Sequence, residues 1–268
     1  MEYDTYTRAN KAVDFTYLDL SFLSDPFSAV EIAEVDLFKI ISPEGLIFYF
    51  EGSGFGYSGD TPTGGTIARI LIGQPTLGQP DILWEAKDVA LPILDLVNAA
   101  KTATLDDDRA VLAKLFSGND QMYGSDFADV LYGFDGKDFI FGQKGADRIG
   151  GGLGKDILEG SRGDDLFFFV EPVGGKNADS ILDFKPNKEL IGLDRSVFDA
   201  VGKKLSKKEF QIGKKADDKK DLVIYDENKG KLYYDDDGKG GDKQALFAKV
   251  DAGTGLDHKD FVVGDFLI

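Results

Sequence analysis

The sequence predicts a mainly all-β protein. Its centre is a parallel β-roll, a flattened solenoid of stacked strands, with a β-rich module before it and an antiparallel cap after it. Three observations predict this class. A nine-residue repeat fills the middle of the 268-residue chain, 12 of the 33 glycines fall within residues 115–168, and alternating apolar and polar residues flank the repeat. The length is about 1.8 times that of a typical domain, so we expect more than one folded region.

The composition excludes several function classes. The chain has 48 acidic and 31 basic residues, and its net charge of -17 repels nucleic acid and attracts metal ions or basic partners. It has no cysteine, which excludes disulfides and thiol chemistry, and its single histidine, His258, excludes metal sites that need two imidazoles. No apolar run approaches the roughly 18 residues of a transmembrane segment, and the first residues do not resemble a cleavable secretory signal.

Residues 1–103 are the first expected region, a β-rich module of unknown role. Alternating segments over residues 12–22, 46–59 and 63–73 predict strands joined by Gly-rich turns, and residues 91–100 predict a short helix. This pattern names no activity.

The second expected region, residues 104–184, begins with a helix that covers the open end of the roll. Thr104 is the predicted N-cap, and three acidic residues follow it in the first turn. The apolar residues expected on one face are Val111, Leu112, Leu115 and Phe116. We interpret this helix as a cap rather than as a surface for a partner.

From Leu115 the chain divides into six units of nine residues. The sixth place of every unit is aspartate: Asp120, Asp129, Asp138, Asp147, Asp156 and Asp165. The eighth place is always apolar: Met122, Leu131, Ile140, Ile149, Leu158 and Phe167. With 37 Asp among 268 residues, five further Asp in register have a chance of about 5 in 100,000, so this is a structural repeat and not a merely Gly- and Asp-rich loop.

These units resemble the RTX (repeat-in-toxin) nonapeptide G-G-x-G-x-D-x-U-x, the hemolysin-type calcium-binding repeat of a parallel β-roll. In each unit six residues form a tight turn that needs positive φ, and three residues form a short strand with one inward apolar side chain. Stacked strands lie about 4.8 Å apart, roughly twice the calcium–oxygen distance of about 2.4 Å. A calcium ion therefore fits between two stacked turns, and we expect the roll to fold when calcium binds.

Alternate units belong to opposite edges of the roll, since two units make one coil. Asp120, Asp138 and Asp156 are expected on one edge, and Asp129, Asp147 and Asp165 on the other. Consecutive members of an edge share an ion, which predicts four sites. The resemblance implies that backbone carbonyls complete each site, from places two and four of the earlier turn and one and three of the later turn. These residues are Phe116, Gly118, Ser125, Phe127, Gly133, Phe134, Asp135, Gly136, Gly142, Gln143, Lys144, Gly145, Gly151, Leu153, Gly160 and Arg162.

Two positions depart from the repeat. Phe127 stands where the fourth-place glycine is expected, and if the backbone there needs positive φ the site is strained or weaker. After Asp165 the register breaks over residues 169–173 and resumes with Asp179 at the sixth place. Asp179 either completes a fifth calcium site with Asp156 or only caps the roll.

Residues 185–268 are the third expected region, an antiparallel β cap with turns near residues 227–230 and 237–241. The run Asp235–Gly238 is interpreted as a hairpin loop, because Tyr233 and Gln244 stand where an EF-hand needs Asp and Glu. This region is similar to the C-terminal part of RTX proteins, and residues 256–268 match their tail. The resemblance implies an uncleaved signal read by a type I exporter of a Gram-negative cell. The alternative is that the tail is only a terminal strand, and both can hold.

The predicted function is that of a secreted, extracellular or cell-surface RTX protein. Its roll would fold on four to five calcium ions after type I export, and it would present an N-terminal module to a glycan or surface partner. The alternative is an extracellular polysaccharide-modifying enzyme. With one histidine, only carboxylate chemistry is open to it, and the candidates are Asp36, Glu44 and Glu51. The Lys-rich segment 203–220 is interpreted as a solvated face, with anionic polysaccharide as the alternative.

Overall fold

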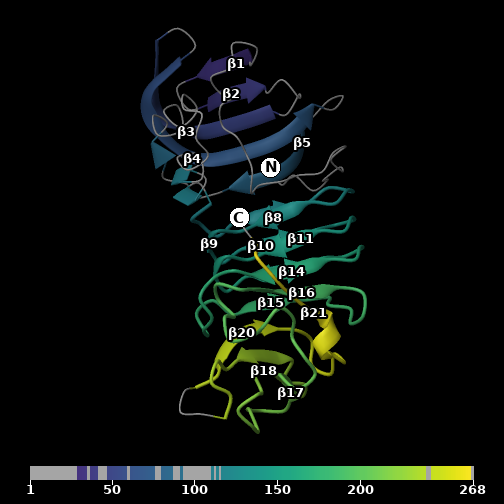
Figure 1. Cartoon of the computed structure of the whole chain (residues 1–268). Coiled ribbons are helices and arrows are strands. Elements are labelled where there is room, and N and C mark those ends of the chain that lie inside the picture. The colour runs from purple at the N-terminus through teal and green to yellow at the C-terminus, as the bar shows by residue number, and fades with distance from the viewer. Residues whose placement is uncertain are drawn as a thin grey trace.

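The computed structural model describes residues 29–34, 37–41, 47–58, 61–75, 80–86, 91–92, 110–111, 113–114, 116–239 and 243–266. Figure 1 shows N-terminal strands, a central roll and C-terminal strands following one another along one long axis. In the part of the chain that these ranges cover, no helix is long and apolar enough to cross a membrane.

The N-terminal strands form an antiparallel meander. In order they are β1 (Ala29–Glu34), β2 (Leu37–Ile41), β3 (Ile47–Ser58), β4 (Thr61–Pro75) and β5 (Pro80–Ala86). A sixth strand, β6 (Leu91–Pro92), pairs with β4 where the sequence predicted the start of a helix. The rest of that predicted helix and the predicted strand over residues 12–22 lie outside the described residues.

The N-terminal sheet continues directly into the roll. β5 pairs antiparallel with β7 (Gln121–Tyr123), the first strand of the repeat, and Trp84 lies opposite Met122. At this end β5 extends the sheet that begins with β7, a pairing that the sequence did not predict. Val111 and Phe116, which the sequence placed on the apolar face of a capping helix, are buried in the core that the roll also contributes to. Of the predicted helix, residues 110–111 and 113–114 are helical, and Thr104 lies outside the described residues.

The repeat folds as the predicted parallel β-roll of two sheets. One sheet contains β7, β10 (Phe139–Phe141), β13 (Ile157–Glu159) and β15 (Asp179–Ile181). The other contains β8 (Val130–Tyr132), β11 (Arg148–Gly150), β14 (Leu166–Phe169) and β16 (Leu190–Asp194). Two short turn strands, β9 (Asp135–Gly136) and β12 (Leu153–Gly154), also pair in parallel.

The eighth-place side chains fill the space between the two sheets. Met122, Leu131, Ile140, Ile149, Leu158 and Phe167 are each 0% exposed. Full burial of such a side chain stabilises the fold by about 1.5–3 kcal/mol. The core of the roll is thus one apolar residue per unit, as the sequence predicted.

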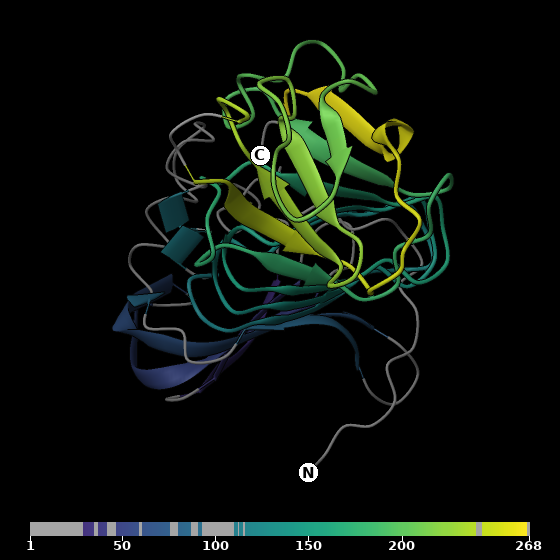
Figure 2. The same cartoon turned by 90° about the horizontal axis from the view of Figure 1, so that it is seen from below.

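The C-terminal strands close the other end of the roll, and Figure 2 shows them in front of it in the view from below. They are β17 (Phe210–Ile212), β18 (Val223–Asp226), β19 (Lys231–Tyr234), β20 (Ala245–Lys249) and β21 (Phe261–Gly264), with the short helix η2 (His258–Asp260). The predicted antiparallel pairing is present in β18–β19–β20. The strands that join this cap to the roll are parallel: β20 pairs with β15, and β21 pairs with β16.

Candidate metal centre

The sixth-place aspartates form two columns, one on each edge of the roll. On the first edge the backbone N–H groups of Asp120 and Asp138 each donate a 2.8 Å hydrogen bond to Oδ1 of the aspartate 18 residues later. On the second edge Asp129 and Asp147 make the same bond at 2.9 and 3.0 Å. The structure therefore brings the aspartates together in the two sets that the alternation of units predicted.

These carboxylates are buried, and four of them have an oxygen without a hydrogen bond. The six sixth-place aspartates are no more than 2% exposed. Four of these aspartates have an Oδ2 atom with no hydrogen-bond partner among the described residues: Asp138, Asp147, Asp156 and Asp165. An unpaired buried carboxylate oxygen is costly, and an all-oxygen donor set is what calcium prefers. The donor set therefore fits a calcium ion.

Burial changes the acidity of the columns. It raises the pKa of Asp138 to about 8 and that of Asp147 to about 7, and the charges of neighbouring column members add to both rises. Burial also raises the pKa of Asp165 to about 6. Hydrogen bonds from the backbone oppose the rise in each case but do not cancel it. A divalent cation between the carboxylates would remove this penalty.

The later turns repeat one backbone conformation at their second place. From the third unit on, this place has positive φ even without glycine, with values of 66° at Phe134, 72° at Gln143 and 67° at Ser161. The fourth place has φ of 150° at Gly136 and 138° at Gly145. The prediction of positive φ is confirmed for the later turns, whereas Phe116 and Ser125, at the second place of the first turn on each edge, do not have it.

The fourth place of a turn has no room for a side chain when another turn of the same edge lies before it. A Cβ at Gly136 would overlap the carbonyl oxygen of Gly118, and a Cβ at Gly154 would overlap that of Gly136. Fourth-place carbonyls thus lie against the next turn of the same edge, where the resemblance places calcium ligands.

Phe127 escapes this constraint because it belongs to the first turn of its edge. Its φ is not positive, and its side chain is 47% exposed. The next fourth-place residue, Gly145, lies so close to the carbonyl oxygen of Phe127 that a Cβ there would overlap it. The backbone at Phe127 does not need positive φ, so this residue is not strained. Its carbonyl still faces the following turn.

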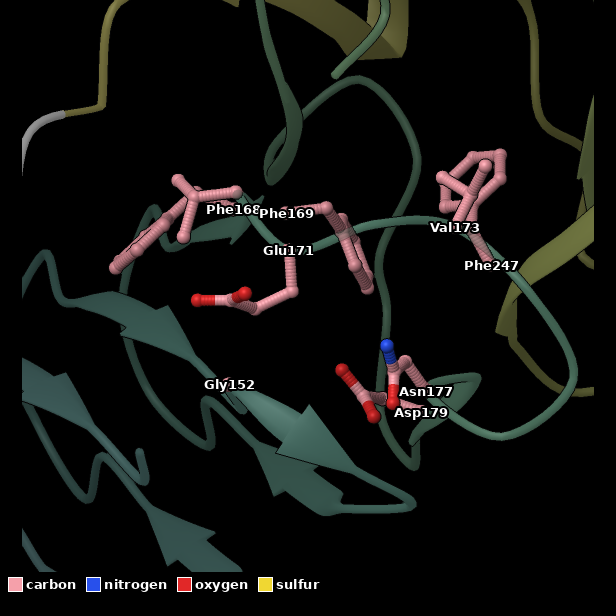
Figure 3. A pocket seen from close by; sticks show the side chains of 9 residues that line it. Gly152, Phe168, Phe169, Glu171, Val173, Asn177, Asp179 and Phe247 are labelled. Atoms are coloured by element: carbon pink, nitrogen blue, oxygen red, sulfur yellow. The ribbon is translucent and has the colours of Figure 1, made fainter. Parts of the chain in front are cut away.

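Asp179 extends the first column in spite of the break in register. The backbone N–H of Asp156 donates a 3.1 Å hydrogen bond to Oδ1 of Asp179, and Ile157 pairs with Ser180. Asp179 is 2% exposed, and burial together with the charge of Asp156 raises its pKa. Figure 3 shows its carboxylate beside Asn177 in a pocket that Gly152, at the second place of its turn, also lines.

Three residues near the end of the second column were not predicted. β14 and β16 pair with Leu166 opposite Leu190. Glu189, which precedes Leu190, therefore lies one coil beyond Asp165 at the equivalent position. Lys185 donates a hydrogen bond to Glu189, and Asp183 accepts one from the backbone N–H of Gly160 in the adjacent turn. Glu189 follows Asp165 by 24 residues, which is outside the repeat period, so no periodic signal identifies it.

The other candidates lie apart from the columns. Asp235–Asp237 follow β19 in the connection to β20, as the hairpin interpretation predicted, and their carboxylate oxygens lie within 4.8 Å of one another. Glu51 lies in β3 opposite Arg69 of β4. Asp36 and Glu44 lie outside the described residues.

Comparisons with known proteins identify the repeat. The family model for the RTX calcium-binding nonapeptide repeat (4 copies) matches residues 116–149 and 150–168. A comparison with curated proteins gives no match. Among solved structures, similarity is found to two subunits of the mannuronan C5-epimerase from Azotobacter vinelandii. AlgE6R3 is 26% identical over 55% of this chain and 74% of that chain, with a TM-score of 0.26. AlgE6R2 is 20% identical over 55% of this chain and 94% of that chain, with a TM-score of 0.32.

A third similarity is to the extracellular lipase LipA from Serratia marcescens. It is 15% identical over 88% of this chain and 31% of that chain, with a TM-score of 0.31. The family match coincides with the two aspartate columns and the parallel roll. Residues 116–168 are therefore an RTX calcium-binding nonapeptide repeat, the family that their sequence resembled.

Proposed function

We propose that this chain is a secreted calcium-binding protein whose roll folds on calcium after type I export. The observation that carries the proposal is the pair of aspartate columns with buried oxygens that no described group satisfies. In this proposal each ion lies between two consecutive aspartates of one edge. Backbone carbonyls of the two turns complete its ligands.

In this proposal the number of ions is taken from the aspartates of the two columns. The first edge supplies sites at Asp120/Asp138 and Asp138/Asp156, and the second supplies Asp129/Asp147 and Asp147/Asp165. Asp179 supports a fifth site with Asp156, because it repeats the hydrogen bond that links the other column members. The proposed total is four to five calcium ions.

Coupling of folding to calcium follows from electrostatics. Each column holds carboxylates whose pKa values are raised by burial, so at neutral pH the metal-free fold must either bind protons or hold like charges together. Calcium relieves both costs, and its binding free energy becomes folding free energy. Low calcium inside the cell would keep the chain unfolded, as transport through a type I exporter requires.

The proposed export signal is the C-terminal tail. In the folded protein Phe261–Gly264 form β21 beside β16, so the tail serves as a strand after export. Expression of the full chain with a type I exporter in a Gram-negative host is expected to release uncleaved protein into the medium. Retention of the full chain in cells that export a known type I substrate would contradict this part of the proposal.

The N-terminal strands are proposed to present an interaction surface for a glycan or another surface partner. The continuous pairing of β5 with β7 supports this role, because folding of the roll would fix the position of the N-terminal sheet. Binding of an anionic and a neutral oligosaccharide to the full chain, with and without calcium, tests it. Calcium-dependent binding is expected, and absence of binding to both would remove glycans as the partner.

The central test is a calcium titration of the metal-free full chain by circular dichroism and calorimetry. We expect a cooperative transition to β-structure with four to five ions bound. Asp147→Ala removes a carboxylate shared by two sites and should lose two ions. Asp164→Ala is the matched control, because the Asp164 side chain is 72% exposed and belongs to no column. A chain that is already folded without calcium, or that binds none, would refute the proposal.

A further inference from the structure

The strand pairing on the second edge continues one step beyond the repeat, although Glu189 accepts its backbone hydrogen bond from Lys185 and not from Asp165. The backbone N–H of Leu190 donates a 2.8 Å hydrogen bond to the carbonyl of Asp165, as that of Leu166 does to Asp147. This equivalence places Glu189 where a further coil would have its sixth-place aspartate. Glu189 is 0% exposed, as buried as the aspartates that precede it. The position after Asp165 thus has the carboxylate of a calcium site without belonging to the repeat.

A lysine ammonium already lies at this position. Nζ of Lys185 donates hydrogen bonds of 2.9 Å to Oε1 of Glu189 and of 3.2 Å to Oδ2 of Asp183. It donates a third, of 2.9 Å, to the carbonyl oxygen of Ser161. Ser161 occupies the second place of the last complete turn, and its carbonyl is one that the repeat pattern assigns to a cation. Lys185 therefore contacts two of the oxygens that an ion at Asp165/Glu189 would take, those of Glu189 and of the Ser161 carbonyl.

The last turn of the repeat differs from the preceding turn in the group that its second-place carbonyl contacts. In the preceding turn of the same edge, the second-place carbonyl of Gln143 accepts a 2.9 Å hydrogen bond from the backbone N–H of Arg162 in the next turn. Ser161 belongs to the last turn of the repeat, so its carbonyl is bound by the ammonium. Asp183 accepts from the backbone N–H groups of Gly160 at 3.0 Å and Ser161 at 2.8 Å, which fixes its carboxylate beside this turn.

One ammonium, that of Lys185, pairs with the carboxylates of both Asp183 and Glu189 at this end. The first column ends differently, since none of the ion pairs within the described residues involves Asp179. The two edges therefore end in different ways, one with a tethered cation and one without.

We propose that the position between Asp165 and Glu189 is a third cation site on the second edge, filled by the ammonium of Lys185 in place of calcium. The site is latent: removal of the ammonium leaves oxygen ligands from Asp165, Asp183, Glu189 and the Ser161 carbonyl, the donor chemistry that calcium binds. The inference rests on the proposed calcium binding of the other sites. It limits the second edge of the wild-type chain to two calcium ions.

The test is an ion count on the full chain. Wild type and Lys185→Ala are stripped of metal, titrated with calcium by calorimetry and analysed for bound calcium by atomic emission. Lys185→Ala is expected to bind one more ion than the wild type. The double variant Lys185→Ala/Glu189→Gln should return to the wild-type count. Lys188→Ala is the matched control, because Lys188 lies in the same loop and only forms an exposed 3.4 Å ion pair with Asp164.

Each outcome decides between the alternatives. An unchanged count in a folded Lys185→Ala variant, with normal binding by the wild type, would overturn this inference alone. A variant that stays unfolded at saturating calcium would also overturn it, because calcium is then unable to replace the ammonium. Absence of calcium binding by the wild type would overturn the proposed function and this inference together.

Discussion

The backbone N–H of Asp138 donates a 2.8 Å hydrogen bond to Oδ1 of Asp156, the equivalent residue one coil later, and Oδ2 of Asp156 is left buried without a hydrogen-bond partner in the described structure. One oxygen of the carboxylate therefore ties the coil to its neighbour while the other remains available to a cation. Because this relationship repeats along both edges, the coils and the cation sites share the same side chains. Loss of one aspartate should affect both.

Interior and end members of a column should differ in their effect on calcium binding. Asp138→Ala is expected to lose two ions and to shift the midpoint of the folding transition at least tenfold to higher calcium, because Asp138 serves two sites. Asp120→Ala, at the start of the same column, should lose one ion. Calorimetry and circular dichroism on the full chain measure both changes.

The control for this comparison is Asp164→Ala, since the Asp164 side chain is 72% exposed and belongs to no proposed site. Its transition should stay within about twofold of the wild type, in line with the small effects typical of exposed substitutions. Equal losses in Asp120→Ala and Asp138→Ala would show that ions are not shared along the column.

The metal-free fold should be more stable in acid than at neutral pH. The pKa of Asp138 is raised by burial from 3.8 to about 8. A group with a raised pKa in the folded state contributes stability that is present below its unfolded pKa and is lost as the pH rises through the folded value. As the pH rises from about 4 to about 8, the metal-free chain should therefore lose β-structure. Circular dichroism and thermal unfolding measure this loss on protein that has been freed of metal and then of chelator.

The same shifts predict the opposite trend with calcium. Because protonated carboxylates must lose their protons to bind the ion, calcium affinity should rise from pH 6 to pH 8, with proton release. Calorimetry in two buffers of different ionisation enthalpy measures that release. Calcium affinity that is independent of pH over this range would contradict the raised pKa values of the columns.

The turn glycines should be unequal in their tolerance of a side chain. Gly154→Ala places a Cβ against the carbonyl oxygen of Gly136 at a residue with φ of 149°, so it should reduce the free energy of unfolding by at least about 2 kcal/mol. Phe127→Gly, at the same place of the first turn on the other edge, should leave the calcium midpoint within about twofold, because no preceding turn requires a glycine there. Chemical denaturation in saturating calcium compares them.

An outer aromatic stack should hold the C-terminal segment to the roll. Phe266 is buried and stacks on Phe168 with ring centroids 5.9 Å apart and an interplanar angle of 16°. Phe168 stacks in turn on Tyr132 at 6.1 Å. Phe266→Ala should lower the free energy of unfolding by about 3 kcal/mol, as is typical for truncation of a buried aromatic residue.

Ile212→Ala serves as the control for that measurement, because Ile212 is 55% exposed. It should change the free energy of unfolding by less than about 0.5 kcal/mol. Thermal and denaturant unfolding in saturating calcium compare the two variants. Equal effects would show that the stack does not hold the C-terminal segment in place.

The periodic part of the protein was predictable from its sequence. Aspartate at the sixth place and an apolar residue at the eighth place recur every nine residues, and nine-residue units can bury their apolar side chains only by stacking. The roll, its core and the membership of its two edges therefore follow from spacing alone. In the N-terminal region, alternation predicted the strands that are observed as β3 and β4, whereas β1, β2 and β5 were not predicted.

The ends of the roll were not predictable, because they depend on contacts between segments of no common period. The pairing of Trp84 with Met122 joins the N-terminal sheet to the roll, and nothing in the sequence around either residue predicted it. The parallel pairing of β20 with β15 and of β21 with β16 likewise gives no local signal, since pairing direction depends on how distant segments meet. Phe127 is tolerated only because its turn is the first on its edge.

By itself the sequence determined the repeat, its period and the oxygen chemistry of its turns, since these are local properties of nine residues. The tertiary structure alone decided where each column stops. Asp179 joins the first column in spite of the break in register, while on the second Glu189 and the ammonium of Lys185 occupy the next position. The physical reason is that a column ends where the next layer of the fold supplies a different group, and that group comes from a segment outside the repeat.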